Sequence, residues 1–292
     1  MALPALASLI IFCYVPMFGL QISFKDYMFN KGIWGSPWVG LTHFKDFFID
    51  PYIGGILVNT IGISLLKVVL MFPAPILLAL MLNEIGGTLF KKITQTISYF
   101  PYFISWVIIA LMAKTWFSPT QGFVNDILLG LGILKEPYLF LGEADAFWGL
   151  AVSLDIWKNI GWGSIIYLAA ISGVDHSLYE AADIDGAKRL QKILNITIPS
   201  IAGTIMIMLI LNIGSMLSGG LYGSNFQESY LLGNSLNISR SEILDTYILK
   251  VGIAMNRYSY ATAVGLLQSV VSFGLLLGAN YSSRKISGES FL

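Results

Sequence analysis

The stretch EAADIDGAKRLQKILNITIP occupies Glu180–Pro199 and is the longest markedly polar and charged run between two apolar spans of the chain. Ser177 and Glu180 have the spacing of a capping box, which predicts the start of a helix. Gly186 permits a backbone turn that a side chain would resist. Pro199 closes the segment just before the next apolar span. The sequence therefore predicts two short helices hinged at a glycine.

The composition is that of a polytopic membrane protein. Of the 292 residues, 55% are hydrophobic and 12% are charged, compared with about 25% charged in soluble domains. The net charge is zero, so no nucleic acid or other polyanion is expected as a partner. The chain has no GxxxxGKS or GxxxxGKT phosphate-binding loop, and its two histidines do not suggest a metal site. No catalytic residue, bound metal or bound cofactor is therefore predicted.

Six apolar segments are long enough to cross a bilayer, which takes about 20 helical residues. They cover residues 3–23, 54–82, 93–112, 147–172, 201–221 and 260–279. The chain is predicted to be a single all-α transmembrane domain over residues 1–292, with the polar loop at residues 175–199. The first span has no basic segment before it and no cleavage site after it, which indicates a membrane helix and not a signal peptide. Its abrupt start suggests that a cytoplasmic segment precedes it.

The segments between the spans are predicted as loops, and two short interfacial helices are expected in them, at residues 121–131 and 243–251. The longest loops cover residues 24–52, 114–145 and 222–257. Lysine and arginine are divided almost equally between the two sides of the predicted helices. The positive-inside rule therefore does not decide the orientation.

Polar side chains inside the predicted spans are informative because lipid penalises them. Asp155, Lys158, Asn159 and Trp162 fall at i, i+3, i+4 and i+7, on one helix face. Asp155 and Lys158 also have the spacing of an ion pair. Such a stripe lines either an aqueous path or a helix interface.

The fifth span carries a weaker stripe with the same spacing, Asn212, Ser215, Met216 and Gly219. Lys67, near the middle of the second span, is expected to face protein or a water-filled cavity. Sugar is the substrate class that suits these side chains, because amides and carboxylates bind hydroxyl groups and Trp stacks on the apolar face of a ring. Lys158 and Lys67 would accommodate a carboxylated sugar.

The polar loop resembles the cytoplasmic EAA loop of type I ABC importer permeases in its two short signatures, Glu180-Ala181-Ala182 and Asp185-Gly186-Ala187. Further stretches extend the resemblance over essentially the whole chain: GIWGSPWVGLTHFKDFF, FPAPILLALMLNE, SYFPYFISWV, IWKNIGWGSIIYLAAISGVD and LDTYILKVG. They are similar to carbohydrate-importer permeases of the polysaccharide, LplB-like branch, which is related to the maltose importer permeases.

The resemblance implies a MetI-like fold of about six transmembrane helices with both ends cytoplasmic, in the cytoplasmic membrane of a bacterium. It implies that the loop is a coupling helix seated on an ATPase subunit. The implied partners are a second homologous permease, two ATP-binding cassette subunits that hold ATP and Mg, and an extracytoplasmic solute-binding protein that delivers an oligosaccharide. Counting from the loop, the sugar contacts of the maltose permease fall at Asp155, Asn159, Trp162, Asn212, Ser215, Met216 and Gly219.

The sequence leaves two other functional interpretations open. An ion-coupled secondary sugar transporter would need carboxylates inside its spans, and Asp155 is the only acidic residue clearly within one. A membrane scaffold or receptor subunit would not need the polar stripe. The sequence names neither the oligosaccharide nor the partner permease, and it leaves open whether Lys158 binds substrate or only pairs with Asp155.

Overall fold

The computed structural model describes residues 2–221 and 223–287, and the regular secondary structure of this part of the chain is all helical, apart from one isolated antiparallel bridge between Lys25 and Trp38. The longer helices are α1 (Ala2–Leu9), α4 (Thr42–Ile49), α5 (Ile53–Leu66), α6 (Pro73–Glu84), α7 (Thr88–Tyr99), α8 (Trp106–Trp116), α9 (Phe123–Gly130), α10 (Phe147–Ser172), α11 (His176–Ile184), α14 (Ala202–Gly214), α15 (Asn225–Leu232) and α18 (Tyr258–Ser287). The shorter ones are α2 (Val15–Met17), α3 (Gly32–Gly35), α12 (Arg189–Lys192), α13 (Ile198–Ser200), α16 (Ile238–Ser241) and α17 (Leu244–Leu249).

Within the described residues, three helical stretches are long and apolar enough to cross a membrane: Leu3–Phe24, Ile53–Glu84 and Tyr258–Lys285. Two bent pairs raise the number to five if each pair is one span: Thr88–Phe103 with Trp106–Trp116, and Arg189–Ser200 with Ala202–Gly214. The predicted fourth span matches α10 residue for residue, but its polar side chains keep it out of this set. The count of six spans stays a prediction.

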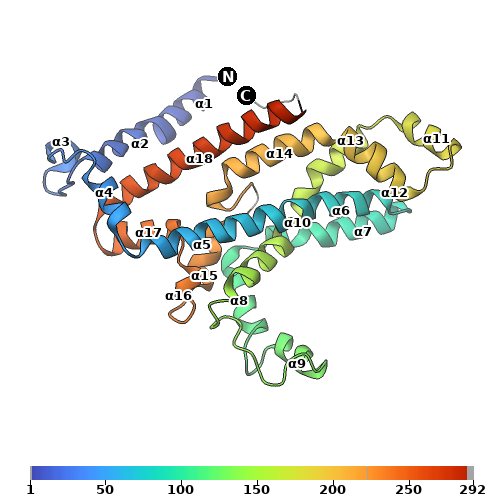
Figure 1. Ribbon diagram of the computed structural model, residues 1–292, viewed down its shortest axis with the longest axis horizontal. Coiled ribbons are helices and arrows are strands. Elements are labelled where there is room, and N and C mark those ends of the chain that lie inside the picture. The colour runs from blue at the N-terminus through green and yellow to red at the C-terminus, as the bar shows by residue number, and fades with distance from the viewer. Residues whose placement is uncertain (1, 222, 288–292) are drawn as a thin grey trace.

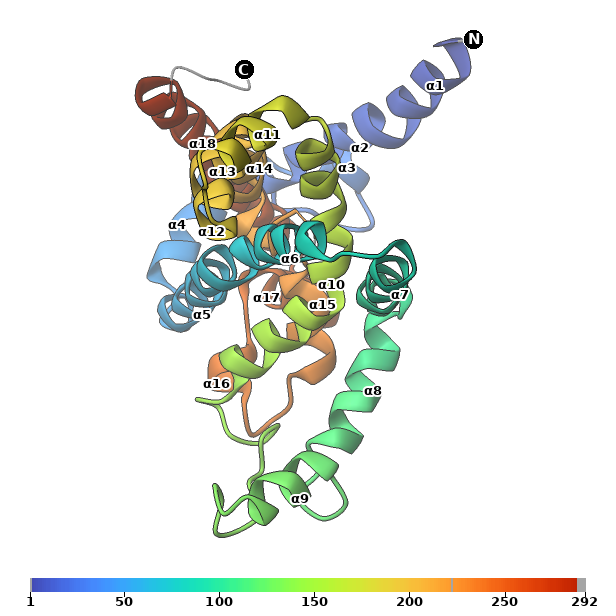
Figure 2. The same cartoon turned by 90° about the vertical axis from the view of Figure 1, so that its right-hand side faces the viewer.

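α10 lies at the centre of the packing. It lies against α5, α6, α7 and the 3-10 turn η4 (Phe100–Phe103). On the other side of the molecule, α18 runs alongside α14 and contacts the 3-10 segment η2 (Phe18–Phe24) (Figure 1). α1 projects away from the rest of the chain (Figure 2), and residues 3–18 at the start of the span Leu3–Phe24 are all exposed, whereas Ser23 near its end is buried. The start of the N-terminal span is therefore left for lipid or for another subunit to cover.

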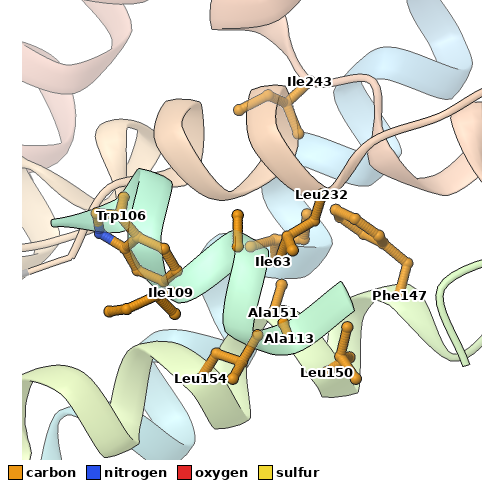
Figure 3. Close-up of a cluster of buried hydrophobic side chains, with 11 residues drawn as sticks. Ile63, Trp106, Ile109, Ala113, Phe147, Leu150, Ala151, Leu154, Leu232 and Ile243 are labelled. Atoms are coloured by element: carbon orange, nitrogen blue, oxygen red, sulfur yellow. The ribbon is translucent and has the colours of Figure 1, made fainter. Parts of the chain in front are cut away.

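A buried apolar cluster attaches α8 to α10 (Figure 3). Trp106, Ile109 and Ala113 of α8 meet Phe147 and Leu154 of α10 in this cluster. Residues from α5, from α15 and from the segment before α17 complete it: Ile63, Leu232 and Ile243. The cluster therefore joins five parts of the chain.

Three prolines inside the spans follow a widened turn of the helix and do not end it. Three π-helical segments, Ile10–Tyr14, Lys67–Met71 and Ile193–Thr197, each end two residues before a proline, namely Pro16, Pro73 and Pro199. Proline lacks the N–H that an α-helix needs and clashes with the preceding turn. A wider turn accommodates this locally. At Pro16 the first span therefore changes its helix type and continues as a helix.

Pro101 lies inside the predicted third span, and the structure breaks the span there into two helices. α7 begins at Thr88, and the chain is extended at Ile104 and Ser105 before α8 starts, with a bend of 99° between the two parts. The predicted fifth span is wrong at its end, because α14 stops at Gly214 and the chain turns at Gly219, where φ is +111°. At membrane depth, irregular backbone of this kind is tolerated only where protein buries it or where it lines a water-filled cavity.

The predicted outer loop over residues 222–257, whose first residue lies outside the described part, folds back into the protein. Asn225 and Glu228 of α15 are buried, and so is Tyr247 of α17. The predicted helices at residues 121–131 and 243–251 are confirmed as α9 and as α17 with the π-segment Lys250–Ala254. The second of them is part of the core and not an interfacial helix, because Leu244 and Val251 are buried too.

α10 approaches α7 closely at one glycine. A Cβ at Gly161 would overlap the carbonyl group of Ser98 on the backbone of α7, whereas a Cβ at Gly149 of the same helix would meet nothing within 4 Å. The contact between these helices therefore depends on the missing side chain at Gly161.

We expect Gly161→Ala to destabilise the protein by about 1–3 kcal/mol, because α10 would be pushed away from rigid backbone. Gly149→Ala serves as the matched control, and it should be neutral or stabilising, since Ala favours helix over Gly by about 1 kcal/mol. Thermal unfolding in detergent, followed by size-exclusion chromatography, measures both. Equal melting temperatures for the two variants would contradict the close contact.

Candidate functional site

The polar loop forms the two hinged helices that the sequence predicts, α11 and α12, and lies at the end of the molecule opposite α3 and α4 (Figure 1). The predicted capping box is wrong. Asp175 is the N-cap of α11, and its Oδ1 accepts a hydrogen bond from the N–H of Ser177 at 2.9 Å. That bond holds the pKa of the Asp175 carboxyl below its ordinary value. Glu180 lies 3.5 Å from the His176 ring instead.

Gly186 ends α11 in a left-handed turn. Its φ is +72°, a conformation that other residues rarely adopt. The N–H of Ala187 donates to the carbonyl of Ala182 at 2.9 Å, and the N–H of Gly186 donates to that of Asp183 at 3.1 Å. This is the hydrogen-bond pattern of a Schellman motif. The predicted hinge is confirmed, and its angle is fixed by backbone hydrogen bonds.

Two side-chain contacts stabilise the loop. One joins α11 to α12, and the other joins α11 to the π-helical segment that follows α12. Lys192 Nζ lies 2.7 Å from Asp183 Oδ1, which joins α12 to α11. The hydroxyl groups of Tyr179 and Thr197 are 2.9 Å apart. Large apolar side chains nevertheless remain exposed on the loop: Leu178, Ile184, Leu190 and Leu194, with Ile184 88% exposed. A group of exposed apolar residues on a charged loop is typical of a docking surface.

A buried charge cluster lies deep in the molecule. Lys67 Nζ lies 2.6 Å from Asp155 Oδ2 and 2.7 Å from Glu228 Oε1. All three side chains are at most 3% exposed. They come from the start of the π-segment that follows α5, from α10 and from α15. A lysine in a membrane span needs such partners, so the expectation that Lys67 faces protein is confirmed.

Asparagines surround this cluster. Asn159 Nδ2 donates to Asp155 Oδ1 at 2.6 Å. Asn225 Nδ2, at the start of α15, donates to Ser64 Oγ at 3.1 Å and to the carbonyl of Leu217 at 3.2 Å. These bonds connect α15 to the second span and to the turn after α14. The helix α15 is therefore positioned by polar contacts on several sides.

Lys158 does not pair with Asp155, which corrects the prediction from their spacing. Its Nζ donates to the carbonyls of Tyr102 and Ile104, both at 2.6 Å. These carbonyls belong to the break between α7 and α8, where helical hydrogen bonds are missing. Trp162 stacks on the Tyr102 ring, with centroids 4.4 Å apart. Lys158 and Trp162 of the predicted stripe thus contact the break, whereas Asp155 and Asn159 belong to the charge cluster.

The predicted stripe of the fifth span is not on one helix, because α14 ends at Gly214, within the stripe. Asn212 is buried in α14, and Ser215 Oγ donates to the carbonyl of Leu211 at 2.8 Å. The Met216 carbonyl accepts a hydrogen bond from Asn225 at 3.4 Å. A Cβ at Gly219 would lie 2.6 Å from the backbone nitrogen of Asn225. The residues of both stripes therefore converge on α15.

Glu228 is the residue that the sequence reasoning missed. It stands in the string NFQESYLLG, which has the polarity of an outer loop. One signal pointed to it: Lys67 lies in a span and had no assigned acidic partner. A pairing across 161 residues cannot be read from local spacing, however, and so the partner stayed unnamed.

Comparison with known proteins identifies the family. The family described as "Binding-protein-dependent transport system inner membrane component" matches residues 71–288. This chain belongs to that family. The permease is 44% identical to protein LplB of Bacillus subtilis (strain 168) over 287 residues. This alignment covers 98% of this chain and 88% of the relative. The permease is 42% identical over 289 residues to the polygalacturonan/rhamnogalacturonan transport system permease protein YteP of the same organism, covering 99% and 88%.

A solved structure shares the fold of the permease. It is the crystal structure of a bacterial ABC transporter involved in the import of the acidic polysaccharide alginate, with a TM-score of 0.89, 38% identity, and coverage of 98% of this chain and 94% of that one. A second crystal structure holds that transporter in complex with an alginate pentasaccharide-bound periplasmic protein, with the same TM-score and identity and coverage of 99% and 94%.

These findings confirm the predicted family, the all-helical MetI-like fold and the role of a transport permease in place of an enzyme. The permease is a multi-pass component of the inner membrane and belongs to an ATP-driven importer whose ATPase subunits are separate chains. The prediction that the permease functions together with a solute-binding protein agrees with the description of the family. The alternative of a secondary transporter acting alone is thereby set aside.

The charge cluster predicts the order in which three variants lose stability. Lys67→Met leaves two buried carboxylates without their cation, and we expect it to destabilise the permease by about 3–5 kcal/mol. Glu228→Gln keeps the shape and the Lys67–Asp155 pair, so we expect a loss of about 1 kcal/mol or less.

Lys250→Met is the surface control. Lys250 forms an ion pair with Glu242 at the surface, with 2.8 Å between Nζ and Oε1, and such pairs contribute about 0–1 kcal/mol to stability. Melting temperatures of the three variants in detergent give the order. A Lys67→Met variant as stable as Lys250→Met would show that the cluster does not hold the fold.

Proposed function

We propose that this permease imports oligosaccharides, including carboxylated ones, and forms the translocation path together with a second, homologous permease. The names of its relatives support this substrate class, since two of them concern acidic polysaccharides, polygalacturonan and alginate. An extracytoplasmic solute-binding protein delivers the sugar. ATP and Mg are bound by two ATPase subunits and not by this chain.

The loop formed by α11 and α12 couples the permease to those ATPase subunits. The observation that carries this proposal is the exposed apolar surface of the loop, with Leu178 47% and Ile184 88% exposed next to a rigid Schellman turn. Glu180 and Asp185 contact or brace the ATPase, Gly186 sets the angle between the helices, and the small side chains of Ala181, Ala182 and Ala187 permit close approach. Binding of ATP then biases a two-state equilibrium between inward-open and outward-open paths.

The substrate path follows the residues at the centre of the molecule. Asn159 and Trp162 belong to the α10 side of the path, and Lys158 positions the break beside it. Asp155 is fully buried and bound to Lys67, so it positions α15 and does not touch the sugar. Asn212, Ser215, Met216 and Gly219 form the turn that supports α15 from the other side.

Gentle solubilisation of the permease from its native membrane, followed by mass spectrometry of what co-purifies, tests the assembly. A second permease and an ATP-binding subunit are the expected companions. A lone chain or a homodimer without an ATPase, under several mild detergents, would overturn the proposed assembly.

The hinge tests the coupling role. In Gly186→Val we expect transport to fall about tenfold or more, the equivalent of about 1.4 kcal/mol of coupling free energy, while the protein stays folded and ATP hydrolysis continues. The reason is that Val resists φ of +72° and changes the angle between α11 and α12.

Gly132→Val is the matched control. Gly132 also has φ of +72° with no atom within 4 Å of an added Cβ, and it ends α9 with the same two hydrogen bonds. Both variants should lose about 1–2 kcal/mol of stability, but Gly132→Val should keep its transport. Uptake and ATPase assays in proteoliposomes measure the difference, and unimpaired transport in Gly186→Val would contradict the coupling role.

A further inference from the structure

The buried charge cluster holds unequal numbers of positive and negative groups. Lys67 supplies one ammonium group, whereas Asp155 and Glu228 supply two carboxyl groups, and all three side chains are at most 3% exposed. With every group ionised, the cluster would carry one net negative charge away from water. An unpaired buried charge is so costly that the group usually becomes neutral instead. The cluster therefore needs either a further cation or a proton on one carboxylate.

No further cation among the described residues pairs with the cluster. The other charged side chains on the helices packed against α15 are Lys114, Lys158, Arg240 and Asp245. Lys158 Nζ is bound by two backbone carbonyls at 2.6 Å, and Arg240 Nε lies 3.3 Å from Asp145 Oδ1. Lys114 is exposed, and Asp245 accepts a hydrogen bond from Gln268 at 2.9 Å. The chain itself therefore leaves the negative charge uncompensated.

The two carboxyl groups differ in their surroundings. Asp155 has a partner on each oxygen, because Asn159 Nδ2 donates to Oδ1 at 2.6 Å and Lys67 Nζ lies 2.6 Å from Oδ2. Glu228 Oε1 accepts a hydrogen bond from Lys67 at 2.7 Å, but its buried Oε2 meets no donor among the described residues. Donors and cations on both oxygens favour the ionised form of a carboxyl group. Asp155 therefore has the surroundings of a carboxylate, and Glu228 has those of a neutral acid.

Two amide oxygens near the cluster lack a hydrogen. Asn159 Oδ1 and Asn225 Oδ1 are buried and meet no donor among the described residues, although the NH2 group of each side chain is hydrogen-bonded. Asn159 is bonded to Asp155, and Asn225 precedes Glu228 by three residues, on the same face of α15. A proton on Glu228 Oε2 would turn an unpaired acceptor into a donor. The region thus offers acceptors for a carboxylic acid and has no donor for a second carboxylate.

We propose that the charge cluster is a proton-binding site, in which Glu228 is a neutral carboxylic acid beside the ion pair of Lys67 and Asp155. The Oε2–H group donates to an asparagine oxygen, and the cluster is then neutral as a whole. In the unfolded chain Glu228 is in water and ionises above about pH 4.3. The folded permease keeps the proton to higher pH and binds one proton more than the unfolded chain. Its stability therefore falls as the pH rises through this range.

Infrared spectroscopy of the purified importer in lipid nanodiscs at neutral pH detects the proton directly. A protonated carboxyl group absorbs at a higher wavenumber than a carboxylate, so the wild type should show this band and Glu228→Gln should lack it. Asp155→Asn should also lose the band, because Lys67 and Glu228 alone form a neutral pair and Glu228 no longer needs its proton. The Asp155→Asn variant tests the idea without a change on α15.

Glu242→Gln is the matched control, because Glu242 is ion-paired with Lys250 at the surface, at 2.8 Å, and should be a carboxylate already. This variant should keep the band of the wild type. A wild type without the band, or a band that persists in both Glu228→Gln and Asp155→Asn, would overturn the proposal. A bound water molecule would then be the donor to Oε2, and both carboxyl groups would be ionised.

The pH dependence of unfolding gives a second, independent measurement. Unfolding constants are measured by titration with a denaturing detergent from about pH 5.5 to about pH 7.5, where an exposed glutamate is ionised. The constant of the wild type should rise about tenfold per pH unit relative to that of Glu228→Gln, as expected for one proton. Glu242→Gln should follow the wild type at every pH. Equal pH dependence of the wild type and Glu228→Gln, or stabilisation of the wild type by Na⁺ that Glu228→Gln lacks, would overturn the bound proton.

Discussion

The ammonium group of Lys67 joins three parts of the chain that are distant in sequence. It is the shared partner of Asp155 on α10 and Glu228 on α15, and all three side chains are almost completely buried. Removing charges from water is costly, and the cost is recovered only where partners and hydrogen bonds are complete. A cluster of one cation and two carboxylates therefore tolerates few arrangements of the helices that carry it. Such buried ionic groups favour one structure over its competitors more than they add stability.

α10 gains its central position from the same physics. Along one helix, Asp155 binds the cluster, Lys158 binds the free carbonyls at the break of the third span, and Gly161 admits the backbone of α7. The break and the turn before α15 are both irregular parts of the chain, and such backbone is tolerated at membrane depth only where protein buries it or where it lines a water-filled cavity. α10 covers both on one side, and a hollow lined by Tyr102, Lys158 and Ser224 lies between the break and the start of α15.

The loop at the far end is continuous with this central region. α10 ends at Ser172 and α11 begins at His176, while the chain after α12 continues to Ser200 and bends by 63° into α14. A movement of the hinged loop would thus be passed to α10 and, through the bend, to α14. Asp155 of α10 meets Glu228 of α15 through Lys67, and the turn after α14 contacts Asn225 of α15, so the loop is connected to the proposed path through packed helices. The connection is a chain of packed helices with hydrogen-bonded ends, and such a chain can carry coupling between distant sites.

Hydropathy and local spacing were enough to predict the class of fold, the extent of α10 and the glycine hinge. They also predicted that Lys67 needs a protein environment. These properties depend on neighbouring residues and on the solvent alone. Only the tertiary structure decided the 99° bend within the third span, the early end of α14 and the burial of α15. It also decided the pairing of Asp155. Spacing allowed a pair with Lys158, but Lys158 can use the free carbonyls of the break, whereas Lys67 has a carboxylate available on either side. The choice between them is made by contacts across 161 residues, and no local pattern in the sequence carries that information.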